Sequence, residues 1–203
     1  MKAVRLMASF GAVKPYVSAP DPVPGSIDIR AVDVSYANGT TSFGNDWDTS
    51  YPVATSAILR IVGFRFQCNI PRSATILSAT LTPYQNQNET WTSADNRTLG
   101  AEQVNNAGIA TSNADIHNRY GNVGVTHNWS NSGTILNSQP VPSGNIAALV
   151  QEIVNRGGWN ANQHIMLWCS HPGNGGQNAQ WRSVVSQSVS VQPRLEVGFE
   201  YIP

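Results

Sequence analysis

The clearest periodic pattern in the chain lies in residues 145–156, where hydrophobic positions recur at the spacing of an α-helix. The apolar residues occupy positions i, i+3, i+4, i+7 and i+8 of one helical face: Ile146, Leu149, Val150, Ile153 and Val154. Ser143 or Asn145 can cap the first free N–H groups, Arg156 suits the last turn, and Gly157 can end the helix in a left-handed conformation. The pattern predicts one short helix, residues 145–156, with its apolar face in the core.

The other hydrophobic positions mostly alternate with polar ones over short segments, which is typical of β-strands. In residues 62–70 the alternating apolar positions are Val62, Phe64, Phe66, Cys68 and Ile70. Similar segments predict strands at residues 26–36, 74–84, 163–170, 182–191 and 194–201, and a short strand near residues 99–104. Many short strands and one helix favour an all-β fold, an antiparallel β-sandwich that the helix closes at one end.

Several of these segments also resemble, in order, the landmarks of a known family. They are Val-Gly-Phe-Arg-Phe at 62–66, Ile-Pro at 70–71, Ala-Thr-Ile-Leu-Ser-Ala at 74–79, the segment around Trp129 at 125–130, the helix with its following Trp at 146–159, and Pro-Arg-Leu-Glu-Val at 193–197. On these landmarks, residues 57–201 are similar to the disaggregatase-related (DNRLRE-type) β-sandwich module. The resemblance implies a jelly-roll-like sandwich. Members of that family occur as accessory, often carbohydrate-binding, modules of secreted microbial proteins and as structural proteins of phage particles.

Composition narrows the classes of partner. The chain has 203 residues, enough for one all-β domain with residues to spare for an arm. Charged residues make up 12%, against roughly 25% in typical soluble domains, so surface polarity must come from Asn, Gln, Ser and Thr, which suits extracellular or particle-borne proteins. The net charge is zero and no basic run interleaves with aromatic residues, so we expect no nucleic-acid partner. No apolar stretch approaches the ~18–20 residues of a membrane span, so we expect no membrane partner.

The first 25 residues differ from the rest and predict an extended N-terminal arm before a sandwich domain of residues 26–203. Prolines at positions 15, 20, 22 and 24 stiffen this segment, and all three of its cations precede the first acidic residue, Asp21. Its apolar anchors are Val4, Leu6, Met7 and Phe10. One interpretation is a solvated tail, and the other is an arm that lies on a neighbouring subunit. We adopt the second, with contacts through Lys2, Val4, Arg5, Leu6, Phe10 and Lys14.

Three aromatic residues are candidates for stacking on a sugar ring: Trp91, Tyr120 and Trp181. The polar stretch of residues 86–122 predicts long loops at one end of the sandwich, where binding sites tend to lie. For any one of these aromatic residues, packing in the core or in an interface is the favoured alternative, because sandwiches bury most of their aromatic side chains. We therefore expect any sugar affinity to be weak.

The sequence carries no recognisable catalytic motif, so we expect a protein that is not an enzyme and holds no cofactor. The histidines, His117, His127, His164 and His171, do not fall at paired ligand spacing, and no two carboxylates among Asp95, Glu102, Asp115 and Glu152 are paired by the sequence. The acidic turn of Asn45, Asp46 and Asp48 offers oxygen ligands that calcium prefers, but side chains bonded to nearby backbone are the favoured interpretation. No metal site is expected.

The two cysteines, Cys68 and Cys169, both fall at inward positions of expected strands. A disulfide would close a long loop and contribute ~4–5 kcal/mol in the chain-entropy model, and an exported protein would favour it. Buried thiols that act as small hydrophobic groups are favoured if the chain folds in a reducing cytosol. The spacing leaves both alternatives open.

Two functional hypotheses follow. The first is a structural protein of a phage or phage-like particle, a decoration, collar or tail component held by its arm, assembled in the host cytoplasm and forming a homo-oligomer or joining a larger assembly. The second is a carbohydrate-binding module of a secreted microbial protein. We favour the first because the start of the chain lacks the complete apolar region of an export signal, and because no linker or catalytic domain accompanies the sandwich.

Overall fold

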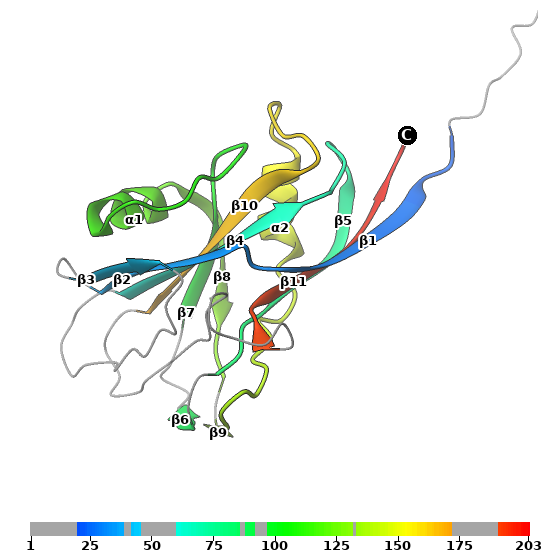
Figure 1. The fold of residues 1–203 in the computed structure, drawn as a ribbon. Coiled ribbons are helices and arrows are strands. Elements are labelled where there is room, and N and C mark those ends of the chain that lie inside the picture. Colours follow the sequence, from blue (N-terminus) through cyan, green and yellow to red (C-terminus); the bar gives the residue numbers. More distant parts are fainter. Residues whose placement is uncertain are drawn as a thin grey trace, which may run out of the picture.

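The computed structural model describes residues 20–38, 42–45, 60–85, 88–91, 97–131, 133–171 and 191–203. These residues form eleven strands and two helices (Figure 1). Their order along the chain is β1 (Val23–Arg30), β2 (Asp33–Asn38), β3 (Ser42–Asn45), β4 (Arg60–Cys68), β5 (Thr75–Thr82), β6 (Glu89–Trp91), β7 (Arg97–Glu102), α1 (Asn113–Tyr120), β8 (Val123–Trp129), β9 (Gly133–Ile135), α2 (Ala147–Val154), β10 (Gln163–His171) and β11 (Arg194–Tyr201). The all-β prediction is confirmed.

The strands form two main antiparallel sheets. One has three strands in the order β1-β11-β5, and the other has six in the order β3-β2-β4-β10-β7-β8. Strands β6 and β9 form a separate antiparallel pair. Neighbours in both sheets are often distant in sequence, so the long central strands β10 and β11 hold together segments from the two halves of the chain.

The main core lies between the three-stranded and the six-stranded sheet. Phe64 and Phe66 of β4 and Leu167 of β10 line it from one side, and Leu195 and Val197 of β11 line it from the other. All five side chains are buried. Along β11, buried and partly exposed residues alternate, as the period of two predicts for a strand with one face on the core.

The single strand expected at residues 26–36 is wrong, because the chain changes sheets in the middle of it. Residues 23–30 form β1 of the three-stranded sheet and residues 33–38 form β2 of the other. The crossing is fixed by two backbone hydrogen bonds: the N–H of Ala31 donates to Pro193 at 2.8 Å, and the N–H of Val32 donates to Arg65 at 2.8 Å. The apolar positions are odd-numbered at Ile27 and Ile29 and even-numbered at Val32 and Val34, so the alternation changes phase at the crossing. The expectation of a single strand overlooked this change of phase.

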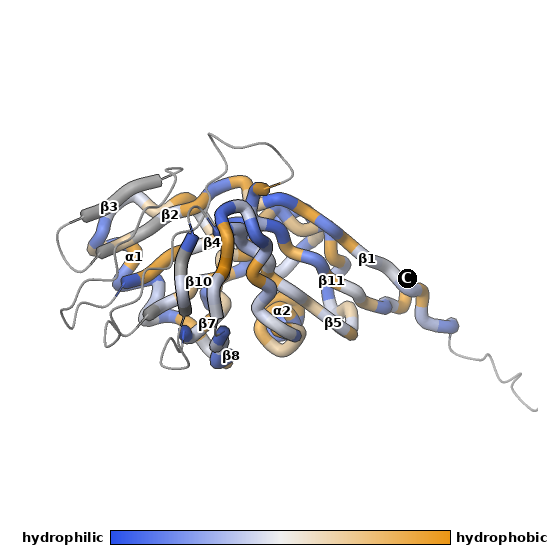
Figure 2. The backbone as a smooth tube through the Cα atoms, turned by 90° about the horizontal axis from the view of Figure 1, so that it is seen from below, coloured by the Kyte–Doolittle hydropathy of each residue, from blue (hydrophilic) through white to orange (hydrophobic). Residues whose placement is uncertain are grey.

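Helix α2 fills one open side of the sandwich, between β5 of one sheet and β7 and β8 of the other (Figure 2). Its predicted apolar face is confirmed, since Leu149, Val150, Ile153 and Val154 are buried, as is Ile146 just before the helix. Trp159 after the helix is also buried, and its Nε1–H donates to the carbonyl of Ile70 at 3.0 Å. The helix therefore closes the core on this side.

The ends of α2 differ from the prediction in two details. The N-cap is Ile146, whose side chain makes no cap bond; Asn145, one residue earlier, accepts from the N–H of Ala147 at 3.0 Å, and Ser143 bonds to β5. Gly157 does not end the helix in a left-handed conformation, because Gly133 and Gly144 are the described glycines with positive φ. The helix ends at Val154 and is followed by Asn155 in a right-handed conformation.

The expectation of a single helix is wrong, because α1 covers the outer face of the six-stranded sheet near β2 and β4. Ile116 of α1 joins Ile61, Met166 and Trp168 of the sheet in a second buried cluster, separate from the main core. Gly63 lies under the Trp168 ring, which leaves no room for a Cβ at this position. The six-stranded sheet is thus covered on both faces at this end, and the sandwich has a third, partial layer.

Some expectations about the chain ends lie at or beyond the margin of the described residues. Strand β1 begins at Val23, so residues 23–25 of the expected arm pair with β11. The rest of the arm up to residue 19 and most of the strand expected at 182–191 lie outside the described residues. Among the residues that the structure does describe, no helix is long and apolar enough to cross a membrane.

Candidate functional site

The outer edge of β5 is closed by three side chains from residues 143–152, a segment that begins before α2 and runs into it. The N–H of Leu81 donates to Ser143 Oγ at 3.1 Å, the N–H of Ala79 donates to Asn145 Oδ1 at 3.1 Å, and the N–H of Ile76 donates to Gln151 Oε1 at 2.7 Å. Backbone groups of the same segment complete the seal, because the N–H groups of Ser143 and Ile146 donate to carbonyls of β5. A strand edge treated in this way offers few free groups to another chain.

The same segment also covers β8, at the edge of the six-stranded sheet. Glu152 Oε2 accepts from the N–H of Val125 at 2.9 Å, and His127 Nε2 lies 3.0 Å from the carbonyl of Ser143. One short segment therefore blocks one edge of each sheet. On this side the sandwich is closed to strand addition.

Strand β1 forms the opposite edge of the three-stranded sheet and is not covered in this way. In an antiparallel pair, alternate residues direct their backbone groups to the partner strand and away from it. The bond from Ala31 to Pro193 places the odd-numbered residues of β1 toward β11, so the N–H groups of Ser26, Asp28 and Arg30 point away from it. No described residue bonds to these three groups. Pro24 has no N–H, so the free donors begin at Ser26.

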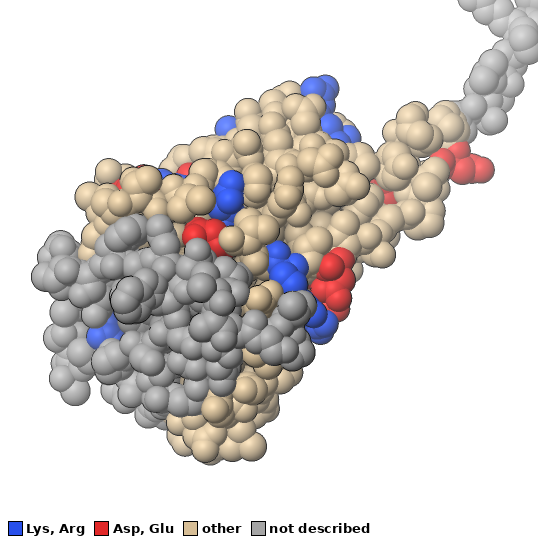
Figure 3. Space-filling view, viewed as in Figure 1, with Lys and Arg blue, Asp and Glu red and all other residues tan. Residues whose placement is uncertain are grey.

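The outer face of the same sheet carries a shallow groove with a volume of about 440 Å³. Its lining is mixed: the polar part consists of the hydroxyls of Ser26, Ser78 and Thr80 and the carboxylates of Asp28 and Glu196, and the apolar part of Ile27, Val197 and Gly198. Arg194 lies 3.8 Å from Asp28 and 3.2 Å from Glu196 and offsets part of their charge. Figure 3 shows acidic and basic side chains side by side over β1 and β11, on a surface that otherwise carries little charge.

Comparisons with known proteins identify no family for this chain. A scan against protein-family models gave no match, and a search of the curated proteins gave none either. The resemblance to the DNRLRE-type sandwich therefore stays a prediction. Its landmarks occupy regular elements: residues 62–66 lie in β4, residues 74–79 lie mostly in β5, residues 146–159 contain α2, and residues 193–197 lead into β11.

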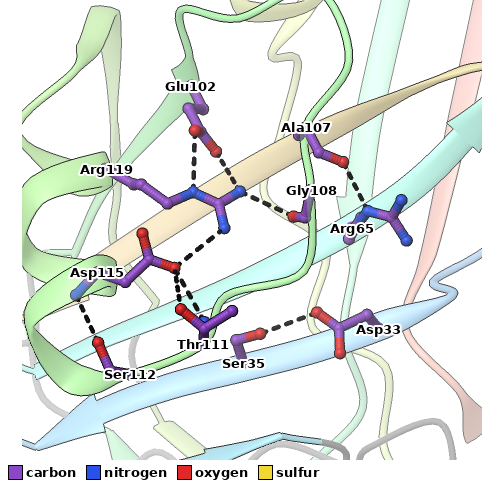
Figure 4. A network of polar contacts seen from close by, with 10 residues as sticks. All are labelled: Asp33, Ser35, Arg65, Glu102, Ala107, Gly108, Thr111, Ser112, Asp115 and Arg119. Carbon is purple, nitrogen blue, oxygen red and sulfur yellow. Dashed lines mark hydrogen bonds and ion pairs between the residues drawn. The ribbon is translucent and has the colours of Figure 1, made fainter.

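A second polar site lies under α1 and is the densest ionic network among the described residues (Figure 4). Arg119 donates to Glu102 through Nε at 2.9 Å and Nη2 at 2.7 Å, and Nη2 also donates to the carbonyl of Gly108 at 2.9 Å. Asp115 lies 3.7 Å from the same guanidinium group. Burial lowers the pKa of Arg119, but the bonds and charges of Glu102 and Asp115 outweigh it and raise the pKa overall. The guanidinium also lies over Trp168, 5.3 Å from the ring centroid.

A neighbouring arginine, Arg65, holds the loop before α1. Its Nε donates to the carbonyl of Ala107 at 2.7 Å. Burial lowers the pKa of Arg65, and the charge of Asp33 partly compensates. Asp33 itself is buried and accepts from the hydroxyl of Ser35 at 2.8 Å.

These contacts give the network a structural role. Glu102, Asp115 and Asp33 each accept from fixed donors of the protein, and Arg119 ties α1 to β7. A general acid or base must instead reach a substrate with an exchangeable proton. The arrangement fastens α1 and its loop to the sheet.

The predicted sugar-stacking residues are not brought together by the described part of the structure. The Tyr120 side chain is half-buried against the second cluster, and its hydroxyl lies 2.6 Å from Ser170 Oγ. Trp91 belongs to β6, but its side chain and the whole of Trp181 lie outside the described residues, as do all the predicted arm contacts. None of the described residues that line the groove on the three-stranded sheet is aromatic.

The acidic turn and the histidines considered in the sequence analysis form no metal-binding cluster among the described residues. No group of three or more His, Cys, Asp or Glu side chains there could hold a metal ion. Asn45 ends β3, and Asp46 and Asp48 lie outside the description. Burial, followed by the charge of Arg65, lowers the pKa of His164, whose Nδ1 lies 2.9 Å from Asn106 Oδ1.

The cysteines are free thiols, as the favoured alternative predicted. Cys68 lies opposite Gln163 and Cys169 lies opposite Val62, so the two are separated by six residues along β10, about 20 Å. A disulfide needs Cα atoms within about 7 Å. Burial raises the pKa of each thiol to about 12, which removes the reactive thiolate at ordinary pH.

The free edge of β1 is the feature that the sequence did not identify. A signal was available, because prolines at positions 20, 22 and 24 precede the alternation of β1 and proline is confined to edge strands and strand ends. Ser26, Asp28 and Arg30 could have been placed on an edge from this pattern alone. That the edge stays open depends on which edges other segments cover.

Proposed function

We propose that this chain is a non-enzymatic structural protein of a phage or phage-like particle, a decoration, collar or tail component. A jelly-roll-like sandwich forms its body, and an extended arm in the residues before β1 attaches it to neighbouring subunits. The observation that carries the proposal is the contrast between the edges of the three-stranded sheet. The β5 edge is sealed by residues 143–151, whereas on the β1 edge, which follows the arm in sequence, no described residue bonds to the N–H groups of Ser26, Asp28 and Arg30.

The arm has the properties of a segment that binds a protein surface. Val4, Leu6 and Phe10 can bury apolar area, and Lys2, Arg5 and Lys14 can orient it against acidic groups. The prolines that follow reduce the conformational entropy lost on binding. Such a segment supports attachment to another subunit better than it supports a freely solvated tail.

The chemistry of the described residues supports a passive role. Its buried ionic groups serve to fasten α1 to the six-stranded sheet, and its cysteines are held as protonated thiols. A rigid body with sealed edges on one side suits a protein that must stay folded inside a large assembly.

The experiment that tests this proposal is incorporation of arm variants into particles. A double substitution, Leu6→Asp with Phe10→Asp, should lower the copy number in purified particles at least tenfold, because burial of a Leu or Phe side chain contributes ~1.5–3 kcal/mol. Quantitative mass spectrometry of the particles gives the copy number. Leu136→Asp, at a position 56% exposed on the body, is the matched control and should incorporate normally. Wild-type copy number for the double variant would contradict the proposal.

A truncation is also informative if it stops at residue 19. The body keeps β1 intact in this variant, whereas a deletion to residue 24 would remove Val23 and Pro24 from β1. We expect the shorter deletion to leave a folded protein that is absent from particles.

The alternative function, a carbohydrate-binding module of a secreted protein, is favoured by one observation. The groove on the three-stranded sheet offers hydroxyls and carboxylates of the kind that bond to sugar hydroxyl groups. Its weakness is the missing aromatic platform, which sugar recognition commonly uses. Tight glycan binding that is lost in Trp91→Ala or Trp181→Ala would promote this alternative over the first.

A further inference from the structure

We propose that the free edge of β1 is the receptor for the arm of a second copy of this chain, whose residues 4–10 add to the sheet as a further strand. This inference rests on the proposed function and names the partner and the surface that the arm binds. The three-stranded sheet would then continue from β1 into a strand of the neighbouring copy. The proposal follows from the backbone, the inner face and the outer face of β1.

The backbone of β1 offers the required hydrogen-bonding groups. Ser26 and Asp28 direct their N–H groups away from β11, and no described residue uses them. A peptide that adds to a strand edge bonds to such alternate residues, and these main-chain bonds supply affinity. Residues 4–10 contain no proline, so every residue of this segment can donate an N–H.

The inner face of β1 lies at an unfinished margin of the core. Ile27 and Ile29 point inward but are only partly buried, unlike Leu195 and Val197 on the neighbouring strand. An added strand would place its own inward side chains beside them. Val4 and Leu6 are spaced two residues apart, as Ile27 and Ile29 are, so they can extend this apolar row.

The outer face supplies a matching charge. Asp28 lies between Ile27 and Ile29 on the outward side, and its side chain is 53% exposed even with Arg194 at 3.8 Å. Arg5 lies between Val4 and Leu6, so an added strand that turns its apolar residues inward turns Arg5 outward. Opposite charges on neighbouring strands are favourable when they lie on the same face.

Pairing of two β1 strands with each other is the competing arrangement, and it fits less well. In a two-fold pairing centred on Ser26, Pro24 of one copy lies opposite Asp28 of the other. Pro24 has no N–H to donate, so the pair loses a bond on each side. A two-fold pairing centred on Asp28 instead would place the two Asp28 side chains opposite each other and bring like charges together.

A second copy is a better source of the arm than the same chain. Residues 11–22 include three prolines and, at ~3.1 Å per residue in an extended conformation, span about 37 Å. A strand from the same chain would need residues 11–22 to fold back on themselves, whereas prolines at positions 15, 20 and 22 favour an extended spacer. The spacer suits a contact between neighbours.

The first test blocks the free N–H of β1 in the full chain. Ser26→Pro removes a donor that the pairing with β11 does not use, and Ser26→Thr is the matched control with the donor intact. We expect Ser26→Pro to weaken self-association at least tenfold in sedimentation velocity, and Ser26→Thr to leave it unchanged. Unchanged self-association in Ser26→Pro would overturn the proposal. Denaturant unfolding of both variants separates this effect from a loss of folding.

The second test uses charge reversal, which a purely structural role cannot imitate. Asp28→Arg and Arg5→Asp should each weaken self-association severalfold, and the two together should restore much of it. Absence of this rescue would count against the proposed pairing even if Ser26→Pro does not fold.

The third test asks which chain supplies the arm. One preparation carries Arg5→Cys and another carries Asp28→Cys, and the two are mixed and oxidised. Cys68 and Cys169 are buried with the thiol pKa raised to about 12, so they do not compete. A disulfide between the two chains is expected. The proposal is contradicted if no disulfide forms between the chains. It is also contradicted if a disulfide forms only within a single chain that carries both substitutions.

Failure of this inference can be distinguished from failure of the proposed function. The arm binds a different subunit if the Leu6→Asp, Phe10→Asp variant is absent from particles while Ser26→Pro and Asp28→Arg do not change self-association and no disulfide forms between chains. The structural function then stands, and the β1 receptor is wrong.

Discussion

A single oxygen of Asn145 joins the helix to the edge of a sheet. Its Oδ1 accepts from the N–H of Ala79 in β5 at 3.1 Å and from the N–H of Ala147 at the start of α2 at 3.0 Å. The residue therefore accepts the N–H of the first helical residue and seals a strand at the same time. It links the two features that close this side of the sandwich.

Asn145→Ala should lower the free energy of unfolding by about 1–3 kcal/mol. The substitution leaves the N–H groups of Ala79 and Ala147 without their acceptor. Urea unfolding followed by circular dichroism measures the change. Asn122→Ala is a suitable control, since Asn122 is exposed and only its backbone groups make described hydrogen bonds. Equal free energies of unfolding for the two variants would mean that the hydrogen bonds of Asn145 do not stabilise the fold.

Leu149→Ala should destabilise the protein by ~2–5 kcal/mol, because it opens a cavity where α2 packs on the core. Leu149 is 1% exposed and Leu136 is 56% exposed. Leu136→Ala, the same chemical change at the surface, should therefore cost less than about 0.5 kcal/mol. Chemical denaturation of both variants gives the comparison, and similar losses would place Leu149 outside the core.

Glu102→Gln should cost about 1–3 kcal/mol. It removes the charge that Arg119 pairs with beneath α1, and loss of one partner of a buried pair costs ~3–5 kcal/mol. The lower figure applies because the Arg119 side chain keeps 14% exposure and Asp115 remains nearby. Glu200→Gln, at a residue without a described ion pair, should change stability by less than about 0.5 kcal/mol. Thermal or urea unfolding that ranks the two variants the other way would show that the network does not hold α1.

The buried thiols predict a specific loss of stability at alkaline pH. The unfolded chain releases its thiol protons near the usual pKa of 9.0, whereas the folded chain keeps them until about pH 12. Between these values the folded state binds more protons, so the free energy of unfolding falls as pH rises. The Cys68→Ala, Cys169→Ala double variant should show a shallower decline from pH 9 upward. An identical decline would show that these thiols titrate normally.

The sequence predicts helix α2 and strands β4, β5, β10 and β11, because their periods are unambiguous. The face of Leu149, Val150 and Ile153 has the spacing of a helix, and Leu195, Val197 and Phe199 have the spacing of a strand. Both patterns report local geometry, so they need no knowledge of the partner element. The structure bears them out with the same residues inward.

Helix α1 was missed because it is mostly polar. Ile116 is its single buried residue, so there is no apolar stripe for a periodicity to detect. Its start did carry a signal, since Ser112 is followed three residues later by Asp115, whose N–H donates to Ser112 Oγ at 3.1 Å. A cap without an apolar face was not enough to predict a helix.

The candidate site depends on contacts that no local pattern reveals. The β5 edge is sealed by Ser143 and Asn145, which lie more than 60 residues further along the chain. The change of sheet after Arg30 depends on Pro193 and Arg65, which lie 162 residues after Ala31 and 33 residues after Val32. The proline pattern before β1 could suggest an edge strand, but only the assembled sheets reveal that this edge is the open one.

Residue-resolved hydrogen exchange of the chain, free and in the assembled particle, tests the central claim most directly. The account predicts that the amides of Ser26 and Asp28 exchange rapidly in the free chain and slowly in the particle, together with new protection of residues 4–10. Amides of β11 such as Val197 should be protected in both states, which provides the internal reference. Equal exchange of Ser26, Asp28 and residues 4–10 in the two states would contradict attachment through the arm and the β1 edge.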